Sequence, residues 1–202
     1  MSRIGIFAGS FDPVHDGHIK FAMAAIKQAK IDKVYFLVEA RPRHKPGITH
    51  PAHRLAMLKI TLKNHKSLEL LDFPDRQFSV AKTLPRLNQK FANDQLFLII
   101  GSDVLEHLPS WPLATSLLKR MNLIVGRRQA SNLKNIKQNI AQLPYLPEEV
   151  FVVTSPAAKL SSRDIRNKLL ANQLTPGLSP IVEAYIKANW LYASPSNSSS
   201  AS

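Results

Sequence analysis

The fold is decided by the stretch Gly9-Ser10-Phe11-Asp12-Pro13-Val14-His15-Asp16-Gly17-His18. Residues 3–8 before it form a short apolar run, which is typical of a buried strand, and a helical pattern extends from residue 17 to about residue 29. Glycine, aspartate and proline between the two patterns favour a turn. The stretch therefore predicts a strand, a loop and a helix in immediate succession.

The same alternation of apolar strand and helical pattern continues along the chain. Parallel strands need long crossovers and are buried on both sides, so six such strands predict a mainly parallel sheet with helices on both faces. We therefore expect an α/β, Rossmann-like, doubly wound fold, in which ligands bind beyond the carboxyl ends of the strands. Further strands are expected at 34–38, 68–71, 96–100, 123–125 and 150–153, and further helices at 51–63, from about 79, and at 133–143, 162–171 and 180–190.

A chain of 202 residues is long enough for one α/β domain and too short for two ordinary ones. We expect a single domain over residues 1–192, including the helices at 162–190, and a disordered serine-rich tail at 193–202. No apolar run approaches the roughly 18 residues that cross a bilayer, and the first residues lack the apolar region of a signal peptide. A cytoplasmic protein without membrane contact is therefore expected.

The composition excludes some kinds of site and favours anionic ligands. With no cysteine, the chain forms no disulfide, thiolate zinc site or iron–sulfur cluster. Its 27 Lys and Arg outnumber its 14 Asp and Glu, which gives a formal net charge of +13. Such a charge predicts attraction to nucleotides, phosphorylated metabolites or nucleic acids. Because the basic residues are spread along the chain, most of them are interpreted as a solvated surface.

The turn after the first expected strand has the features of a phosphate site. Gly9 allows the backbone to approach a ligand, and Ser10 offers a hydroxyl beside the N–H groups of the turn. The start of the following helix carries about half a positive charge, which favours an anion. Gly9, Ser10 and Phe11 are therefore candidate phosphate-binding residues.

His15 and His18 lie three positions apart at this helix start, so both rings address one face, and Gly17 removes a side chain that could block a ligand. Contact with phosphate, packing and a metal site are the three interpretations. A metal site is disfavoured, since two imidazoles alone are a poor zinc site and only Asp12 and Asp16 are near. Phosphate contact is favoured over packing because the pair follows a glycine-serine turn after a buried strand.

The segment His15-Asp16-Gly17-His18 resembles the H-x-G-H signature of the nucleotidylyltransferase superfamily. A second segment, Leu160-Ser161-Ser162-Arg163-Asp164-Ile165-Arg166, is similar to the superfamily's I-S-S-T-x-I-R segment, again at a helix start. The resemblance implies that Ser161, Ser162 and Arg166 hold the polyphosphate of ATP and that His15, His18 and Arg166 are catalytic. Ser161 is also expected to cap the helix.

Within the superfamily the chain resembles the bacterial nicotinate-nucleotide adenylyltransferases. Residues 101–111, Gly-Ser-Asp-Val-Leu-Glu-His-Leu-Pro-Ser-Trp, are similar to that family's G-x-D…L-x-x-W stretch. The resemblance implies that Gly101 and Asp103 contact nucleotide and that Trp111 flanks the pyridine ring of the mononucleotide, where an indole face suits a pyridinium. A tryptophan before Pro112 is otherwise a loop anchor, and both interpretations of Trp111 stay open.

Two further segments carry the resemblance. Arg43-His44-Lys45-Pro46 and the helix with Arg54 match the family's P-x-x-K-P and R-x-x-M-L, so that Lys45 is a candidate phosphate cation and Arg54 is expected only at the surface. Residues 78–84 resemble S-Y-T-V-D-T-L, which makes Ser79 a candidate contact for the mononucleotide. Phe78, Ser79 and Lys82 depart from that segment, and Arg163 replaces a threonine in the second signature.

The implied activity is adenylyl transfer from ATP to the 5′-phosphate of nicotinate mononucleotide, giving deamido-NAD and pyrophosphate in NAD biosynthesis. Mg²⁺ is expected to bind through the phosphates and not through protein ligands. One alternative is transfer to nicotinamide mononucleotide or another phosphorylated acceptor; another, in a different class, is a non-catalytic module that binds nucleotides or nucleic acid. ATP and nicotinate mononucleotide are the expected partners, nucleic acid ranks last, and a homo-oligomer stays open.

Overall fold

The structure, a computed structural model, describes residues 1–42, 47–73, 78–127, 132–155, 157 and 159–193. Lys45 and residues 194–202 of the expected tail lie outside these ranges. The centre of the molecule is a six-stranded sheet in the order β3-β2-β1-β4-β5-β6, and all neighbouring strands are parallel. The strands are β1 (Arg3–Gly9), β2 (Lys33–Val38), β3 (Leu68–Leu70), β4 (Gln95–Gly101), β5 (Met121–Arg127) and β6 (Val150–Thr154). This arrangement confirms the expected doubly wound α/β fold.

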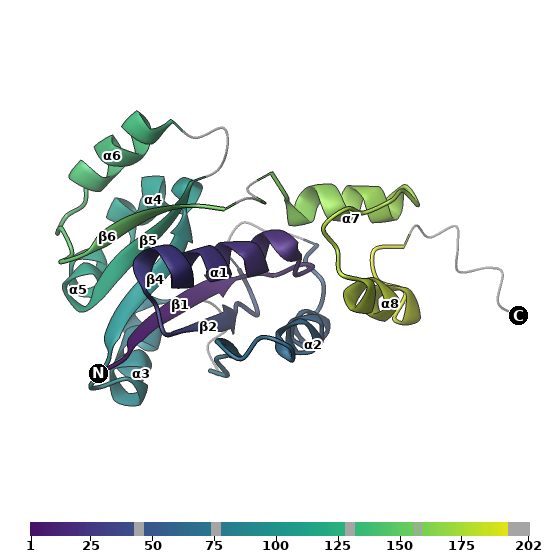
Figure 1. Cartoon of the computed structure of the whole chain (residues 1–202), viewed down its shortest axis with the longest axis horizontal. Helices are drawn as coiled ribbons and strands as arrows, with labels where there is room; N and C mark the ends of the chain where they lie inside the picture. The colour runs from purple at the N-terminus through teal and green to yellow at the C-terminus, as the bar shows by residue number, and fades with distance from the viewer. Residues whose placement is uncertain (43–46, 74–77, 128–131, 156, 158, 194–202) are drawn as a thin grey trace, which may run out of the picture.

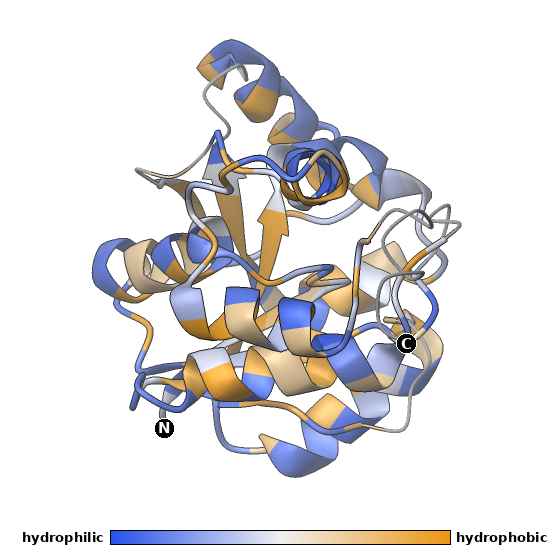
Figure 2. Ribbon diagram, turned by 90° about the vertical axis from the view of Figure 1, so that its right-hand side faces the viewer, coloured by the Kyte–Doolittle hydropathy of each residue, from blue (hydrophilic) through white to orange (hydrophobic). Residues whose placement is uncertain are grey.

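Helices cover both faces of the sheet (Figure 1). Alternate side chains of each strand point to opposite faces, so that Phe7 and Ile6 of β1 belong to two different cores. The first core lies under α1 (Asp16–Ala29) and α2 (Pro51–Leu62) and continues to α7 (Ser162–Leu170) and α8 (Pro180–Ala188). The second lies under α3 (Val80–Lys90), α4 (Ser102–His107), the 3₁₀ turn η1 (Leu108–Ser110), α5 (Ala114–Arg120) and α6 (Leu133–Ala141). In Figure 2 the strands between these helices are apolar, while the helices carry hydrophilic outer faces.

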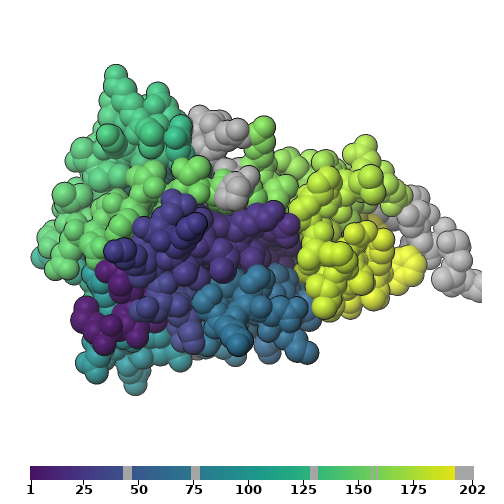
Figure 3. Space-filling view, viewed as in Figure 1, coloured from purple at the N-terminus to yellow at the C-terminus, as the bar shows by residue number. Residues whose placement is uncertain are grey.

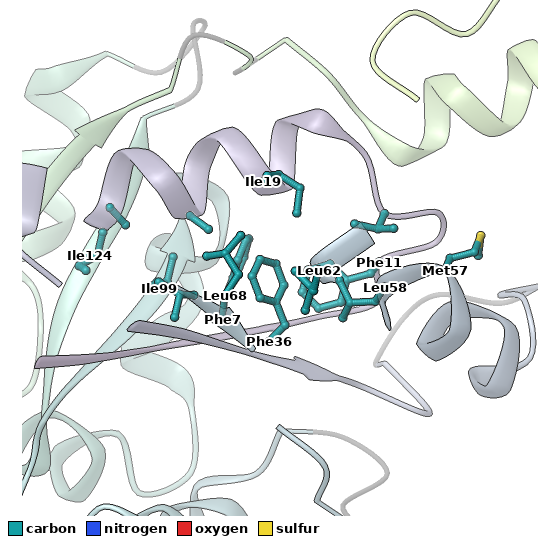
Figure 4. Packing of buried hydrophobic residues seen from close by; sticks show 14 of the residues in the cluster. Phe7, Phe11, Ile19, Phe36, Met57, Leu58, Leu62, Leu68, Ile99 and Ile124 are labelled. Atoms are coloured by element: carbon teal, nitrogen blue, oxygen red, sulfur yellow. The ribbon is translucent and has the colours of Figure 1, made fainter. Parts of the chain in front are cut away.

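Helix α1 lies directly on the strands that carry the first motif. Its buried residues Ile19, Ala22, Ala25 and Ala29 recur every three or four positions and therefore form one stripe. Figure 4 shows Ile19 over the strands that bear Phe7 and Phe36. Three of the four stripe residues are alanines, which bring the helix backbone close to the sheet.

The switch in strand order lies between β1 and β4. These strands pair from Arg3 opposite Gln95 to Ile6 opposite Leu98, and both run on beyond the last pair, to Gly9 and Gly101. The carboxyl ends of the two strands therefore part where the chain leaves β1 on one side and β4 on the other, which is the ligand-binding crevice of doubly wound sheets. α7 and α8 lie at this end of the sheet (Figure 1).

At the opposite end of the sheet a charged network ties the amino ends of three strands together. The Arg3 guanidinium donates to both carboxylate oxygens of Glu149, at 2.9 and 3.0 Å, and to Gln95 Oε1 at 2.7 Å. It also lies over the Phe97 ring, 4.6 Å from the centroid. Its hydrogen bonds hold the pKa of Glu149 below the usual range, against the opposing effect of burial.

The segment between β4 and β5 differs from the sequence expectation. It contains α4, η1 and α5, none of which the apolar pattern predicted. α4 has six residues and η1 three, which is too short for a helical period, and Pro109 and Pro112 interrupt the stretch. Among the helices that the described residues form, none has the length and apolar character needed to span a membrane.

Candidate active site

The loop after β1 is held by a buried aromatic residue. Phe11 is 1% exposed, adopts a left-handed φ of 47°, and packs edge-on against Phe7 at 5.4 Å between ring centroids. A Cβ on Gly9 would lie 3.1 Å from Cζ of the Phe11 ring. Gly9 thus makes room for Phe11, and its expected role at a ligand stays a prediction.

His15 and His18 form the amino-terminal cap of α1. The Gly17 N–H donates to His15 Nδ1 at 3.0 Å, and the His15 N–H donates to His18 Nδ1 at 3.2 Å. The two rings are stacked, with centroids 3.8 Å apart and planes inclined by 31°. The Phe11 ring lies edge-on against His18 at 5.1 Å and supports the stack from the side of the core. The rings are therefore packed in the structure, and their contact with phosphate, which the sequence analysis favoured over packing, stays a prediction.

These hydrogen bonds assign the tautomer of both imidazoles. An Nδ1 atom that accepts a backbone N–H cannot carry the ring proton, so the neutral ring carries it on Nε2. Protonating Nδ1 as well would set two N–H groups against each other. Nε2 is thus the donor atom of His15 and of His18, whose rings are stacked at the helix start.

The first turn of α1 uses its backbone donors within the protein. The Asp16 N–H donates to the Gly177 carbonyl at 2.8 Å, and the His18 N–H donates to the His15 carbonyl at 2.9 Å. The Gly17 N–H is taken by His15 Nδ1. These three backbone N–H groups are therefore engaged within the protein, and the expected contact of this helix start with an anion stays a prediction.

Gly17 is required by the histidine ring beside it. A Cβ at this position would lie 2.7 Å from His15 Cε1, 2.8 Å from His15 Nδ1 and 3.1 Å from Leu160 Cβ. Distances below 3.0 Å force a shift, so any side chain would displace the His15 ring. The glycine of the H-x-G-H segment thus sets the position of its first histidine.

The second motif meets the first at this point. Ser161 caps α7 by accepting the Asp164 N–H at 3.4 Å, as expected. Ser162 Oγ donates to the Pro13 carbonyl at 3.0 Å. Arg166 Nη1 donates to the Asp12 carbonyl at 2.6 Å and lies 3.7 Å from Asp12 Oδ2. The start of α7 therefore docks on the turn that immediately precedes the two histidines, although 154 positions separate Arg166 from Asp12.

Arg54 is not at the surface, and the expectation that placed it there is wrong. Its side chain is fully buried at the start of α2, and its guanidinium donates to four backbone carbonyls at 2.7–2.9 Å. These carbonyls belong to Ser10 after β1, to Glu39 and Ala40 after β2, and to Thr49 before α2. Burial lowers the pKa of Arg54, and the nearby Asp12 carboxylate opposes this effect. Arg54 thus joins the two loops that leave the neighbouring strands β1 and β2.

Asp12 is the second buried charge of the site. It is 2% exposed, and its carboxylate accepts the Tyr192 hydroxyl at 2.5 Å and the Thr49 N–H at 3.4 Å, in addition to the ion pair with Arg166. The pKa of Tyr192 is raised, first by burial and then by this hydrogen bond. The sequence interpretation considered Asp12 only as a neighbour of the histidines and did not consider Tyr192.

The residues expected to hold the mononucleotide lie on the other side of the crevice. Trp111 follows η1 and packs on the second core, with its ring 6.0 Å from that of Phe78 between centroids. The Phe78 N–H donates to Glu39 Oε1 at 2.9 Å, and the Ser79 N–H donates to Thr83 Oγ1 at 3.1 Å. The contact with Phe78 agrees with the interpretation of Trp111 as a loop anchor. Its contact with a ligand stays a proposal.

At the start of α4, Gly101 precedes the helix and Asp103 lies in its first turn. A Cβ on Gly101 would collide with a carboxylate oxygen of Asp103, so this carboxylate folds back over the glycine. Among the residues that the structure describes, no three His, Asp or Glu side chains gather in a way that could hold a metal ion.

Comparison with known proteins places the chain in a family. Residues 6–168 match the family model described as cytidylyltransferase-like. The nicotinate-nucleotide adenylyltransferase of Bacillus subtilis (strain 168) is 33% identical over 203 residues, which cover 96% of this chain and 100% of that relative. The chain belongs to the nicotinate-nucleotide adenylyltransferase family.

Solved structures of another nicotinate-nucleotide adenylyltransferase share the fold. Plasmodium falciparum nicotinic acid mononucleotide adenylyltransferase, complexed with NaAD or with APC, superposes with TM-scores of 0.77 and 0.76. The identities are 20% and 19%, and each comparison covers 95% of this chain and 98% of the other. At this identity the likeness establishes the common architecture.

In this adenylyltransferase-family chain the structure brings four of the predicted residues together, namely His15, His18, Ser162 and Arg166. Arg54, Asp12 and Tyr192 complete the same region. The sequence interpretation placed Arg54 at the surface, named Asp12 only as a neighbour of the histidines, and did not consider Tyr192. A buried Arg54 was signalled only by its position near the start of a helix with an apolar face. For Tyr192 the sequence held no signal, because its partner lies 180 positions earlier.

Proposed function

We propose that the chain transfers the adenylyl group of ATP to the 5′-phosphate of nicotinate mononucleotide, which yields deamido-NAD and pyrophosphate. The observation that carries the proposal is the stacked His15–His18 pair with both Nδ1 atoms occupied, directly beside the α7 start that bears Ser162 and Arg166. Family membership supports the reaction, since the Bacillus subtilis relative is a nicotinate-nucleotide adenylyltransferase.

In the proposed reaction an oxygen of the mononucleotide phosphate attacks the α-phosphorus of ATP in line. The bond from the α-phosphorus to the bridging oxygen breaks, and pyrophosphate leaves with its electron pair. The protein contributes positioning and charge stabilisation. His15 and His18 donate from Nε2 to the α-phosphate as negative charge accumulates there. Arg166, which has five N–H donors and uses one on the Asp12 carbonyl, holds the polyphosphate with Ser10, Ser161 and Ser162. Lys45 belongs to this set on the family resemblance.

Mg²⁺ fits this site as a companion of the triphosphate. The residues around the histidines are nitrogen and hydroxyl donors, and the nearest buried carboxylate, Asp12, is engaged by Tyr192 and Arg166. Mg²⁺ keeps several waters and is commonly held through substrate phosphates. Bound in this way it would supply charge neutralisation on the phosphate oxygens, while the side chains named above orient the phosphates.

The mononucleotide is assigned to the crevice wall formed by Asp103, Trp111 and Ser79, and Gly101 and Asp103 also belong to the proposed ATP-binding set. The Trp111 ring is partly exposed and is held at one side by Phe78, so it presents a supported surface for a pyridine ring. Discrimination between nicotinate and nicotinamide mononucleotide depends on this wall. Turnover of the two compounds is therefore to be compared side by side with ATP.

The test uses His18→Asn and Mg²⁺-dependent pyrophosphate release. Asparagine keeps a short acceptor for the His15 N–H and removes the Nε2 donor, so the helix cap survives while the phosphate contact is lost. We expect kcat to fall about a hundredfold, as for the loss of one transition-state donor, with little change in thermal stability. Turnover within threefold of wild type would exclude this role for the histidines. If wild type releases no pyrophosphate with any mononucleotide but oligonucleotides bind with a steep salt dependence, the non-catalytic alternative is correct.

A further inference from the structure

The residues after α8 reach back to the loop after β1. Tyr192 lies against the first core, and its hydroxyl donates to Asp12 Oδ1. The side of α8 is fixed on α2, where Tyr185 OH and His53 Nδ1 lie 2.9 Å apart. Figure 3 shows the yellow segment of α8 against the blue segment of α2. The last described part of the chain therefore joins elements that carry the proposed ATP site.

We propose that Tyr192 is a positioning residue for ATP, acting through Asp12 on Arg166. The inference rests on the proposed function, and it adds to it a residue outside both signature motifs. Tyr192 touches no phosphate in this assignment. It fixes the carboxylate that faces the phosphate-binding guanidinium.

Because Asp12 is buried, its carboxylate is stabilised by the partners it has within the protein. A carboxylate that is 2% exposed depends on hydrogen bonds and charge pairing for its stability. Its oxygens are divided: Oδ1 accepts the Tyr192 hydroxyl, and Oδ2 faces Arg166 Nη1 at 3.7 Å and the Thr49 N–H at 3.4 Å. An O–H donor to a carboxylate is among the stronger hydrogen bonds, so Tyr192 sets the rotation of the Asp12 carboxylate.

Without the Tyr192 hydroxyl, Oδ1 loses the donor shown for it, and the carboxylate gains from turning toward Arg166. A closer pair would draw the guanidinium toward Asp12 and away from the polyphosphate. The effect is directed, because Arg166 and the turn at Asp12 lie on the ATP side, whereas Trp111 and Phe78 belong to the second core. The Michaelis constant for ATP should therefore change without a matching change for the mononucleotide.

The experiment compares Tyr192→Phe with Tyr185→Phe. Both variants remove one phenol hydroxyl from the same C-terminal region, but the Tyr185 hydroxyl faces His53 on α2 and not the loop. We expect Tyr192→Phe to raise the KM for ATP about tenfold, which corresponds to about 1.4 kcal/mol, and to leave the KM for nicotinate mononucleotide within twofold. Tyr185→Phe should change neither constant by more than twofold.

A double-mutant cycle with Asp12→Asn tests the route. An amide removes the charge that makes the Tyr192 bond strong, so the effect of Tyr192→Phe should shrink from about tenfold to less than threefold in that background. Independent effects of the two substitutions would overturn the proposal, as would equal increases of both Michaelis constants. A KM for ATP within twofold of wild type in Tyr192→Phe would also overturn the proposal.

ATP affinity measured by calorimetry separates this proposal from the proposed reaction. Wild type that binds ATP but turns over no mononucleotide contradicts the reaction alone, and the affinities of the variants still decide the role of Tyr192. If Tyr192→Phe does not fold, Asp12→Asn probes the same bond from the other side. Unchanged ATP affinity in Asp12→Asn would then reject the route through Asp12.

Discussion

Replacing Arg54 with methionine should destabilise the protein through the loops that surround the site. Methionine fills a similar volume but donates no hydrogen bond, so the carbonyls of Ser10, Glu39, Ala40 and Thr49 lose four donors in a buried place. At a net value of about 1 kcal/mol for each hydrogen bond, the free energy of unfolding falls by about 4 kcal/mol. This is a large part of the typical 5–15 kcal/mol of a folded domain. The expected decrease in Tm is about 8–16 °C.

Urea unfolding followed by circular dichroism measures this loss, and ATP kinetics measure its effect on the site. Lys59→Met on the same helix is the matched control, because Lys59 is exposed and its replacement should change stability by at most about 0.5 kcal/mol. Arg54→Lys keeps the charge but not the planar fork and should fall between the two. An Arg54→Met protein within 1 kcal/mol of wild type, with unchanged ATP kinetics, would refute the view that Arg54 joins these loops.

Two further predictions concern the opposite end of the sheet and the histidine stack. Because the pKa of Glu149 is lowered in the folded protein, its contribution is present above the usual pKa near 4.5 and is lost as pH falls through the folded value. Glu149→Gln should therefore cost about 1–2 kcal/mol at pH 7. The urea midpoints of variant and wild type should converge as the pH falls below 4.5 and through the lowered pKa of Glu149, so a constant gap would contradict the assignment. Gly17→Ala should shift the His15 ring and lower kcat at least tenfold, with a loss of about 1–3 kcal/mol in stability. Wild-type kcat in that variant would show that the ring position tolerates displacement.

The layered fold could be predicted because its signals are local and repeated. Six apolar runs of strand length, separated by helical patterns, predict a parallel sheet whatever their partners are, and the structure has that sheet. The family prediction was confirmed as well. The sequence analysis did not predict α4, η1 and α5 between Ser102 and Arg120. These elements are shorter than the window of residues in which a helical period can be recognised. Packing against the second core, through Leu105, Leu108 and Leu117, decides their structure.

The site could be predicted only where a motif marks it. His15, His18, Ser162 and Arg166 belong to two recognisable segments, and the structure brings these segments together. Gly17 has a further reason that spacing cannot reveal, because a Cβ at this position would collide with the ring of His15. Arg54 was misplaced for a related reason: its partners are backbone carbonyls of three separate segments, and carbonyls have no sequence signature.

The bonds of Asp12 also bear on the order in which the protein folds. Contacts that join positions 154 and 180 residues apart form late, because a long loop must close before they can reward the chain. During synthesis from the amino terminus, the loop after β1 leaves the ribosome early and waits for α7 and Tyr192. A nascent chain can thus assemble much of the sheet while its proposed ATP site is incomplete, and we expect affinity for ATP only once the last helices have formed.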